Sequence, residues 1–314
     1  MAYEFYGNES VLQLLTDSLS KNRLAHAYLF YGEKGLGKCT LAIQFAQAIL
    51  CKCNDAPCHH CVSCNKIKKN IHPDCTILGG ETGKNQFHAE TIREMRSQAF
   101  VKPNESAYRV FILQNVQAMS QTAANALLKI LEEPPKNVIF LLTCQDKSSL
   151  LQTISSRCLP IRIAPVSPAL CKQAVLSSLG ESTENLEQII RLCDGSIGQA
   201  LFWIQDEKGR AAFTIMQKLS EALCTGDELN ILQALAPLEQ DAMLFEEVLL
   251  CLKRRFRAAL QNRFAQTGQN DRLSSSLSLR QIIKDIECVQ RLERALQQNA
   301  NLRLAATWLS ANLK

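Results

Sequence analysis

The chain has 314 residues, 46% of them hydrophobic and 21% charged, which excludes a disordered protein and predicts two or three globular domains. Its net charge of +5 is mildly basic and identifies no partner, because a dedicated nucleic-acid binder carries a concentrated basic stripe. No apolar run approaches the roughly 18 residues of a membrane span, and MAYEFYGNES lacks the pattern of a signal peptide. We therefore expect a cytoplasmic protein with no membrane partner.

The first 166 residues alternate between helical stripes and short apolar runs. Helices are expected at 8–20 behind an Asn8 cap, at 38–50, from a capping box at Thr91, at 123–133 and near 150–154. Strands are expected at 27–31, 76–78, 110–113, 138–142 and 159–163. This alternation predicts an α/β domain with a parallel sheet and helices on both faces.

The character changes after Pro165-Val166-Ser167-Pro168, because no further strand is evident. Helices fit 168–178, 184–193 and 196–205, and long amphipathic patterns continue from about 209 to the end. We expect three parts: an α/β domain over 1–166, a small helical domain over 167–207 and an all-helical domain over 208–314.

The turn after the first strand has the spacing G-x-x-x-x-G-K of a phosphate-binding loop. Its candidate nucleotide-binding residues are Gly32, Gly35, Gly37, Lys38, Cys39 and Thr40. In such a loop, backbone N–H groups cradle phosphates, the lysine neutralises them, and the next residue offers a hydroxyl to Mg²⁺. Cys39 offers a soft sulfur instead, and Thr40 lies about 100° further round the helix.

A second departure follows the strand at 110–113. Hydrolytic P-loop proteins place an acidic metal ligand there, commonly with an acidic base, but this chain has Gln114 and Asn115. Neutral amides neither balance the charge of Mg²⁺ nor take a proton from water. We expect no ATP hydrolysis by the chain alone. Whether the loop binds ATP or ADP, or is only a structural turn, stays open.

A cysteine-rich insert begins at the end of the helix at 38–50. Its spacing predicts a structural zinc site with four thiolate ligands, which are Cys51, Cys58, Cys61 and Cys64. Cys53 could replace Cys51, and His59 or His60 could replace a cysteine. A cluster of free thiols is the alternative.

Arg157 stands between a short helix and a strand. At such an edge, an arginine can reach a neighbouring subunit's γ-phosphate, where its planar guanidinium suits the developing charge. By spacing alone, a surface arginine that caps the preceding helix is the more common case. The basic runs Lys66, Lys68 and Lys69, and Lys253 to Arg257, are usually solvated faces.

Several stretches together resemble the bacterial clamp-loader subunits of the AAA+ class. They are Arg23-Leu-Ala-His-Ala-Tyr-Leu-Phe30, the four-cysteine insert, Asn125-Ala-Leu-Leu-Lys-Ile-Leu-Glu-Glu-Pro-Pro135 and Ser156-Arg157-Cys158. The resemblance implies an AAA+ domain with a zinc insert, a helical lid and a C-terminal helical collar. The stretch Asn301-Leu-Arg-Leu304 resembles the final helix of that collar. Thr143 occupies the usual first-sensor position.

Within that family, the motor subunits carry intact nucleotide motifs, and the delta prime type is usually degenerate. Cys39, Gln114, Asn115 and Gly198, which replaces a sensor arginine, all point to the delta prime type. The resemblance implies a non-motor subunit in a five-subunit ring with gamma/tau-like motor and delta subunits. It would give Arg157 to a neighbour's ATP site and help to load the sliding clamp onto primed DNA in replication, as a component of DNA polymerase III. The alternatives are an ATP-hydrolysing gamma/tau-like motor, a zinc-containing DNA-binding protein with a degenerate P-loop and, remotely, a nucleotide kinase.

Overall fold

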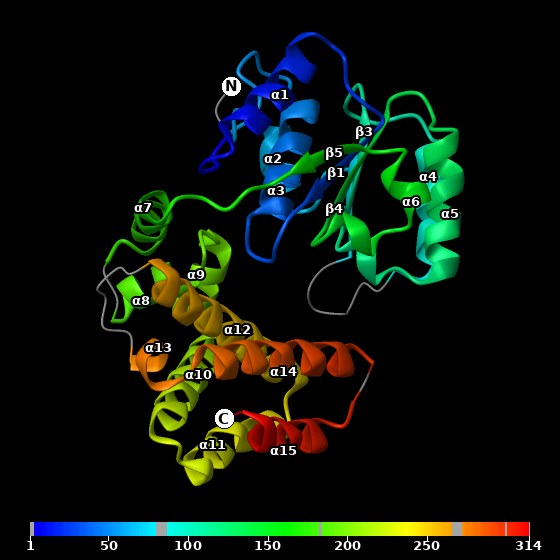
Figure 1. Cartoon of the computed structure of the whole chain (residues 1–314). Helices are drawn as coiled ribbons and strands as arrows, with labels where there is room; N and C mark the ends of the chain where they lie inside the picture. The colour runs from blue at the N-terminus through cyan, green and yellow to red at the C-terminus, as the bar shows by residue number, and fades with distance from the viewer. Residues whose placement is uncertain (1–2, 80–86, 182–183, 266–271, 299, 314) are drawn as a thin grey trace. The chain divides into compact units, whose positions relative to one another are not determined.

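The computed structural model describes residues 3–79, 87–181, 184–265, 272–298 and 300–313 (Figure 1). The chain divides into two compact units, Met1–Val166 and Ser167–Lys314. No helix within the described ranges combines the length and the apolar character that crossing a membrane requires.

The first unit is built on a five-stranded parallel sheet. Its strands are β1 (Ala27–Tyr31), β2 (Cys75–Gly79), β3 (Arg109–Gln114), β4 (Val138–Cys144) and β5 (Leu159–Arg162). They lie in the order β2-β3-β4-β1-β5, so the phosphate loop that follows β1 leaves the sheet between β4 and β5. All five predicted strands are present, and the AAA+ α/β fold class is confirmed.

Helices cover both faces of this sheet. Side chains alternate between the faces along each strand, so Tyr28 and Phe30 pack on one side and Ala27 and Leu29 on the other. Helices α1 (Glu9–Ser20), α2 (Lys38–Leu50) and α3 (Val62–Lys68) pack on the first face (Figure 1). Helices α4 (Ala89–Ala99), α5 (Gln121–Glu132) and α6 (Gln152–Ser155) pack on the second. The apolar strands are therefore buried on both sides.

Asn8 does stand at the N-cap of α1, but its side chain does not cap that helix, and the predicted start of α4 was wrong. The Asn8 side chain caps no helical N–H; it exchanges two hydrogen bonds with the backbone N–H and C=O of Ala164, at 2.8 and 3.0 Å. Helix α4 begins at Ala89, two residues before Thr91. Thr91 already has a helical backbone, so it cannot supply the extended conformation that a capping residue needs. Helix α3, inside the cysteine insert, was not predicted.

The second unit is entirely helical in its described residues, as expected. Its helices are α7 (Pro168–Leu179), α8 (Leu186–Leu192), α9 (Ile197–Gln205), α10 (Glu207–Thr225), α11 (Glu228–Leu235), α12 (Ala242–Ala265), α13 (Arg272–Ser276), α14 (Leu279–Gln297) and α15 (Leu302–Asn312). Asn301 caps α15 by accepting the N–H groups of Arg303 and Leu304.

A buried polar junction links the beginning of this unit to α12. The Glu247 carboxylate accepts the indole N–H of Trp203 at 3.0 Å and an amide N–H of Gln199. Arg254 donates to the carbonyl oxygen of Cys193 at 2.7 Å and lies 5.6 Å from the centre of the Trp203 ring. The segments expected as lid and collar are thus packed within one unit. Their division at residue 207 stays a prediction.

Candidate functional site

The phosphate loop has the backbone that its glycines predict. Gly37 has a φ of +83°, and a Cβ atom there would lie 2.8 Å from the ring of Phe5. Gly32 lies so close to β5 that a Cβ atom would come within 2.6 Å of the carbonyl oxygen of Ile163. Both positions require glycine, because a side chain would displace either the N-terminal segment or the edge of the sheet.

Lys38 is only 6% exposed and donates its ammonium group to the loop's own Glu33 carbonyl oxygen at 2.7 Å. The ammonium group lies at the first turn of α2, where a phosphate group would also find backbone N–H donors. Lys38 therefore retains the position of a phosphate-binding lysine while it satisfies a carbonyl group of the loop.

Two of the three residues predicted to replace the metal machinery, Cys39 and Asn115, meet at Thr143. Among the described residues, no contact of the Gln114 side chain joins them there. The Thr143 hydroxyl accepts the backbone N–H of Asn115 at 3.0 Å, and the Cys39 thiol lies 3.7 Å from the same hydroxyl. Thr143 is fully buried, whereas Thr40 is exposed. The Thr40 hydroxyl therefore does not take the place that Cys39 occupies beside Thr143. Cys39, Asn115 and Thr143 form a neutral cluster without a carboxylate of their own.

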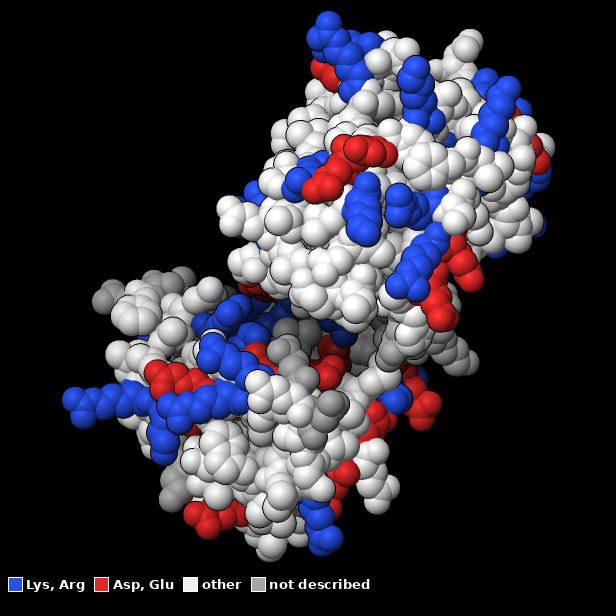
Figure 2. Space-filling model, turned by 90° about the vertical axis from the view of Figure 1, so that its right-hand side faces the viewer, with Lys and Arg blue, Asp and Glu red and all other residues white. Residues whose placement is uncertain are grey.

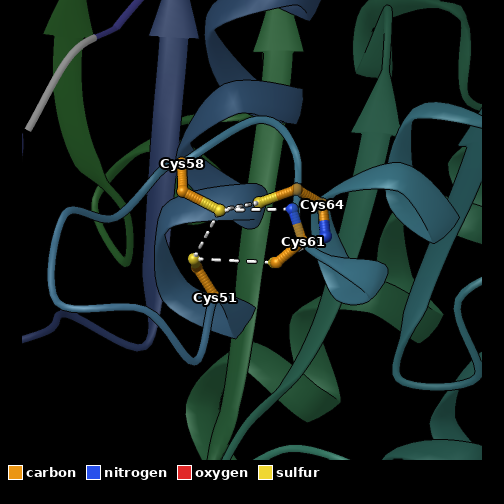
Figure 3. Close-up of side chains that lie close together, drawn as sticks. All are labelled: Cys51, Cys58, Cys61 and Cys64. Carbon is orange, nitrogen blue, oxygen red and sulfur yellow. Dashed lines mark hydrogen bonds between the residues drawn. The ribbon is translucent and has the colours of Figure 1, made fainter.

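Four cysteine side chains of the insert converge on one point (Figure 3). Their Sγ atoms lie 3.6 Å (Cys51–Cys58), 3.8 Å (Cys51–Cys61) and 4.0 Å (Cys58–Cys64) apart. A tetrahedral zinc ion with Zn–S bonds of about 2.3 Å needs sulfur atoms about 3.8 Å apart. The cluster therefore has the dimensions of a zinc site and could bind this ion.

The backbone around the cluster donates to sulfur, as thiolate ligands require. The N–H groups of Cys53, Cys61 and Cys64 point at the Sγ atoms of Cys51, Cys58 and Cys61, at 3.3 to 3.4 Å. Burial opposes ionisation of Cys58, but hydrogen bonds from the backbone of His60 and Cys61 lower the pKa of its thiol to about 5.

The geometry distinguishes between the alternatives that the sequence left open. Cys51 belongs to the four-sulfur cluster, while Cys53 is exposed and contributes an N–H donor. Neither His59 nor His60 joins the group of potential ligands.

Helix α3 attaches the insert to the sheet domain. Cys61 is its N-cap residue, its buried Ile67 packs into the core of the first unit, and Gln47 of α2 donates to the carbonyl oxygen of Cys64 at 3.0 Å. Lys66 forms an ion pair with Glu105 at 2.7 Å. One of the three lysines of this basic run is therefore paired within the chain.

Arg157 lies in the turn between α6 and β5. Its Nη1 donates to the carbonyl oxygen of Thr153 at 2.8 Å, and its Nη2 forms an ion pair with Glu132 at 2.8 Å. The arginine thus does cap the preceding helix, which was the alternative weighed from spacing. About a third of its side chain remains exposed, so it is also accessible. Sequence reasoning missed Glu132 as its partner, although Glu132 stands in the quoted Glu-Glu-Pro-Pro motif.

The basic runs do not form one free stripe. Lys253 pairs with Glu293 at 2.7 Å, and Arg254 is 95% buried in the junction with Trp203. Figure 2 shows Lys and Arg interspersed with Asp and Glu on the face that it presents. The expectation that these runs are solvated is therefore wrong for Arg254, whose guanidinium group lies inside the second unit.

Comparisons with known proteins agree with this architecture. The family described as DNA polymerase III, delta subunit, matches residues 7–167. The delta′ subunit of DNA polymerase III from Escherichia coli is 30% identical over 223 residues, which cover 70% of this chain and 67% of that one. The delta′ subunit of Bacillus subtilis is 33% identical over 58% of each chain. The gamma subunit of Buchnera aphidicola is 30% identical over 63% of this chain and 56% of its own.

The chain thus spans little more than half the length of the Buchnera and Bacillus relatives. Among solved structures, a DNA polymerase III gamma subunit-related protein of Thermotoga maritima matches with a TM-score of 0.53, at 17% identity. That match covers 96% of this chain and 97% of the other, and at this identity it supports the fold alone. The family match extends over half of the chain and includes the phosphate loop, the cysteine cluster and Arg157, so the chain belongs to the DNA polymerase III delta subunit family.

Proposed function

We propose that this chain is a non-motor, delta prime-like subunit of a DNA polymerase III clamp loader, and that it supplies Arg157 to a neighbouring subunit's ATP site. The family supports a role in DNA replication. The observation that carries the finer proposal is the contrast between two sites. The chain's own nucleotide site has the amides Gln114 and Asn115 after β3, where an acidic metal ligand is expected, whereas Arg157 is accessible on a turn.

The proposed chemistry follows from this contrast. Mg²⁺ and a base are needed to hydrolyse ATP, and Cys39 with the two amides supplies neither. An arginine delivered in trans needs only an accessible guanidinium group held on a rigid element, because its charge stabilises the phosphoryl group during transfer. Nucleotide binding by Gly32, Gly35, Gly37 and Lys38 without hydrolysis is compatible with this role.

The two remaining parts have structural roles in this proposal. Zinc held by Cys51, Cys58, Cys61 and Cys64 would fix the insert on α2. Residues 167–207 would act as the lid and 208–314 as the collar that joins motor and delta subunits in a five-subunit ring. The apolar side chains exposed on α11 and α15, which are in contact, support an assembly surface; they are Leu229, Leu232, Leu304 and Trp308.

The test is a reconstitution with the motor and delta subunits of the same cell. ATP turnover stimulated by clamp and primed DNA is compared for the wild-type chain and Arg157→Ala. We expect the variant to assemble normally and the ATP turnover at the site that receives Arg157 to fall by about 10³-fold or more, the contribution of an arginine finger. Normal turnover by the assembled variant would refute the arginine-finger role. Failure of the wild-type chain to assemble would refute the clamp-loader role itself.

An ATP-hydrolysing gamma/tau-like motor is the second candidate, because gamma and tau subunits are also among the relatives, at 30% to 34% identity. It predicts Mg²⁺-dependent hydrolysis of ATP by the isolated chain. Hydrolysis that is lost in Lys38→Ala would favour this candidate over the first.

A further inference from the structure

Two motifs far apart in the sequence meet at Arg157. Glu132 is the last residue of α5, and Pro134-Pro135 ends that helix. Arg157 follows α6, which packs against α5. Their side chains form an ion pair at 2.8 Å, so the Glu-Glu-Pro-Pro motif holds the arginine of the Ser-Arg-Cys motif.

The contacts fix the orientation of the guanidinium group and leave most of its donors available. An arginine carries five N–H donors in a rigid plane. Within the described part of the chain, Arg157 uses one N–H of Nη1 for the Thr153 carbonyl oxygen and one of Nη2 for Glu132. Three N–H donors therefore remain for an anion, and two tethers on different elements hold the plane in place.

This ion pair contributes little to the stability of the fold. The side chains of Arg157 and Glu132 are 34% and 49% exposed, and water screens such pairs. Its effect lies in the conformational freedom of a long side chain. A free arginine loses rotamer entropy when it meets its ligand, whereas a tethered one has already lost it.

We infer that Glu132 is a positioning residue, which holds Arg157 ready for the γ-phosphate of a nucleotide bound by a neighbouring subunit. This inference rests on the proposed arginine-finger function. Glu132 touches no reacting atom, and it acts by raising the fraction of molecules in which the guanidinium group already points in the productive direction.

The test uses the reconstituted complex and measures kcat and KM for ATP with clamp and primed DNA. The variants are Glu132→Ala, Glu132→Gln, Arg157→Ala and the double variant Glu132→Ala/Arg157→Ala. Glu133→Ala is the matched control, because it removes the same charge at the adjacent position. Glu133 is exposed and has no ion pair in the part of the chain that the structure describes.

We expect Glu132→Ala to lower kcat about five-fold. An exposed ion pair can change the ratio of held to free Arg157 side chains by about this factor. The KM for ATP should not change, because the neighbour's own P-loop binds the nucleotide. Glu132→Gln keeps the length and a carbonyl acceptor, so it should restore kcat to within about two-fold of wild type. Glu133→Ala should match wild type, and the double variant should match Arg157→Ala.

The outcomes separate the two proposals. If Arg157→Ala lowers kcat while Glu132→Ala matches wild type or exceeds it, the positioning role is wrong and the arginine finger stands. An added loss in the double variant, or a loss in Glu133→Ala as large as in Glu132→Ala, also overturns the positioning role. If Arg157→Ala is fully active, the arginine-finger function fails and this inference fails with it.

Discussion

Replacing Asp74 by Asn removes a charge that the first unit holds in its interior. Asp74 lies just before β2 and is fully buried. Its Oδ1 accepts the backbone N–H of Asn104 at 2.6 Å, and its Oδ2 accepts those of Glu105 and Ser106 at 2.7 and 3.0 Å. Arg109 adds a longer contact at 3.5 Å. Asp74 thus holds the loop that carries Glu105, and Glu105 forms the ion pair with Lys66 of α3.

The magnitude follows from these bonds. A hydrogen bond to a charged group contributes about 1 kcal/mol more than a neutral one, and three of them end on Asp74. In Asp74→Asn, an amide NH₂ also faces at least one N–H donor, which adds a further cost of about 1–3 kcal/mol. We expect the free energy of unfolding of the first unit to fall by about 4 kcal/mol at neutral pH.

The pH dependence supplies a second signature. Burial alone would raise the pKa of Asp74, but the three N–H groups and Arg109 outweigh it, so the pKa lies below its usual value. A carboxyl group with a lowered folded-state pKa stabilises the fold above its unfolded-state value of about 3.9, and this contribution is lost as the pH falls through the folded-state pKa. The difference between wild type and Asp74→Asn should therefore be full at pH ~7 and shrink below pH ~4.

The assay is urea unfolding followed by two signals. Both tryptophans lie in the second unit, so their fluorescence reports that unit alone. All five tyrosines lie within residues 1–166, so the tyrosine transition is the part of the near-UV dichroism change that the tryptophan fluorescence does not follow. The tyrosine transition should shift in Asp74→Asn, and it should stay nearly unchanged in Asp17→Asn, an exposed carboxylate of the same unit. A tyrosine midpoint equal to that of wild type at neutral pH, or a difference that persists undiminished in acid, would refute this account.

Three further predictions concern the other sites. The purified chain should release about one zinc ion when its thiols are titrated with a mercurial, Cys58→Ser should contain none, and Cys53→Ser should retain it. The isolated chain should show no ATP hydrolysis above background, and Cys39→Thr alone should not create it, because the site would still lack an acidic metal ligand. Glu247→Leu should destabilise the second unit by about 3 kcal/mol, measured by tryptophan fluorescence in urea, because it leaves the buried indole N–H of Trp203 without its acceptor.

The sheet could be predicted because its strands are buried on both faces and are therefore continuously apolar. Val138–Leu142, for instance, has no polar residue, and the structure extends it only to Cys144. The helix starts were harder to predict, because a capping residue is defined by its backbone conformation. The backbone of Asn8 has a left-handed conformation, and its side chain donates a hydrogen bond to the carbonyl oxygen of Ala164, 156 residues away. No local sequence pattern reveals such a contact.

The cysteine spacing predicted a four-ligand site, but it could not choose between Cys51 and Cys53, since both lie at a plausible distance along the chain. The choice depends on where α2 ends. Cys51 is the first residue after that helix and turns its sulfur toward Cys58, whereas Cys53 follows in an exposed loop. Similarly, Glu132 and Arg157 are 25 positions apart, and only the packing of α5 against α6 brings them together.

Contacts within the chain hold the phosphate loop in its conformation without a metal ion. Gly32 is required by the close approach of β5, so the sharp turn serves the sheet independently of any nucleotide. Lys38 satisfies the Glu33 carbonyl oxygen, and the Thr143 hydroxyl satisfies the N–H of Asn115. Cys39 fills the remaining space beside Thr143 with a side chain that needs no strong hydrogen bond. The polar groups of Lys38, Asn115 and Thr143 thus have partners within the chain. The bond to Glu33 uses one of the three N–H donors of the Lys38 ammonium group, so this bond by itself does not prevent a phosphate from binding there.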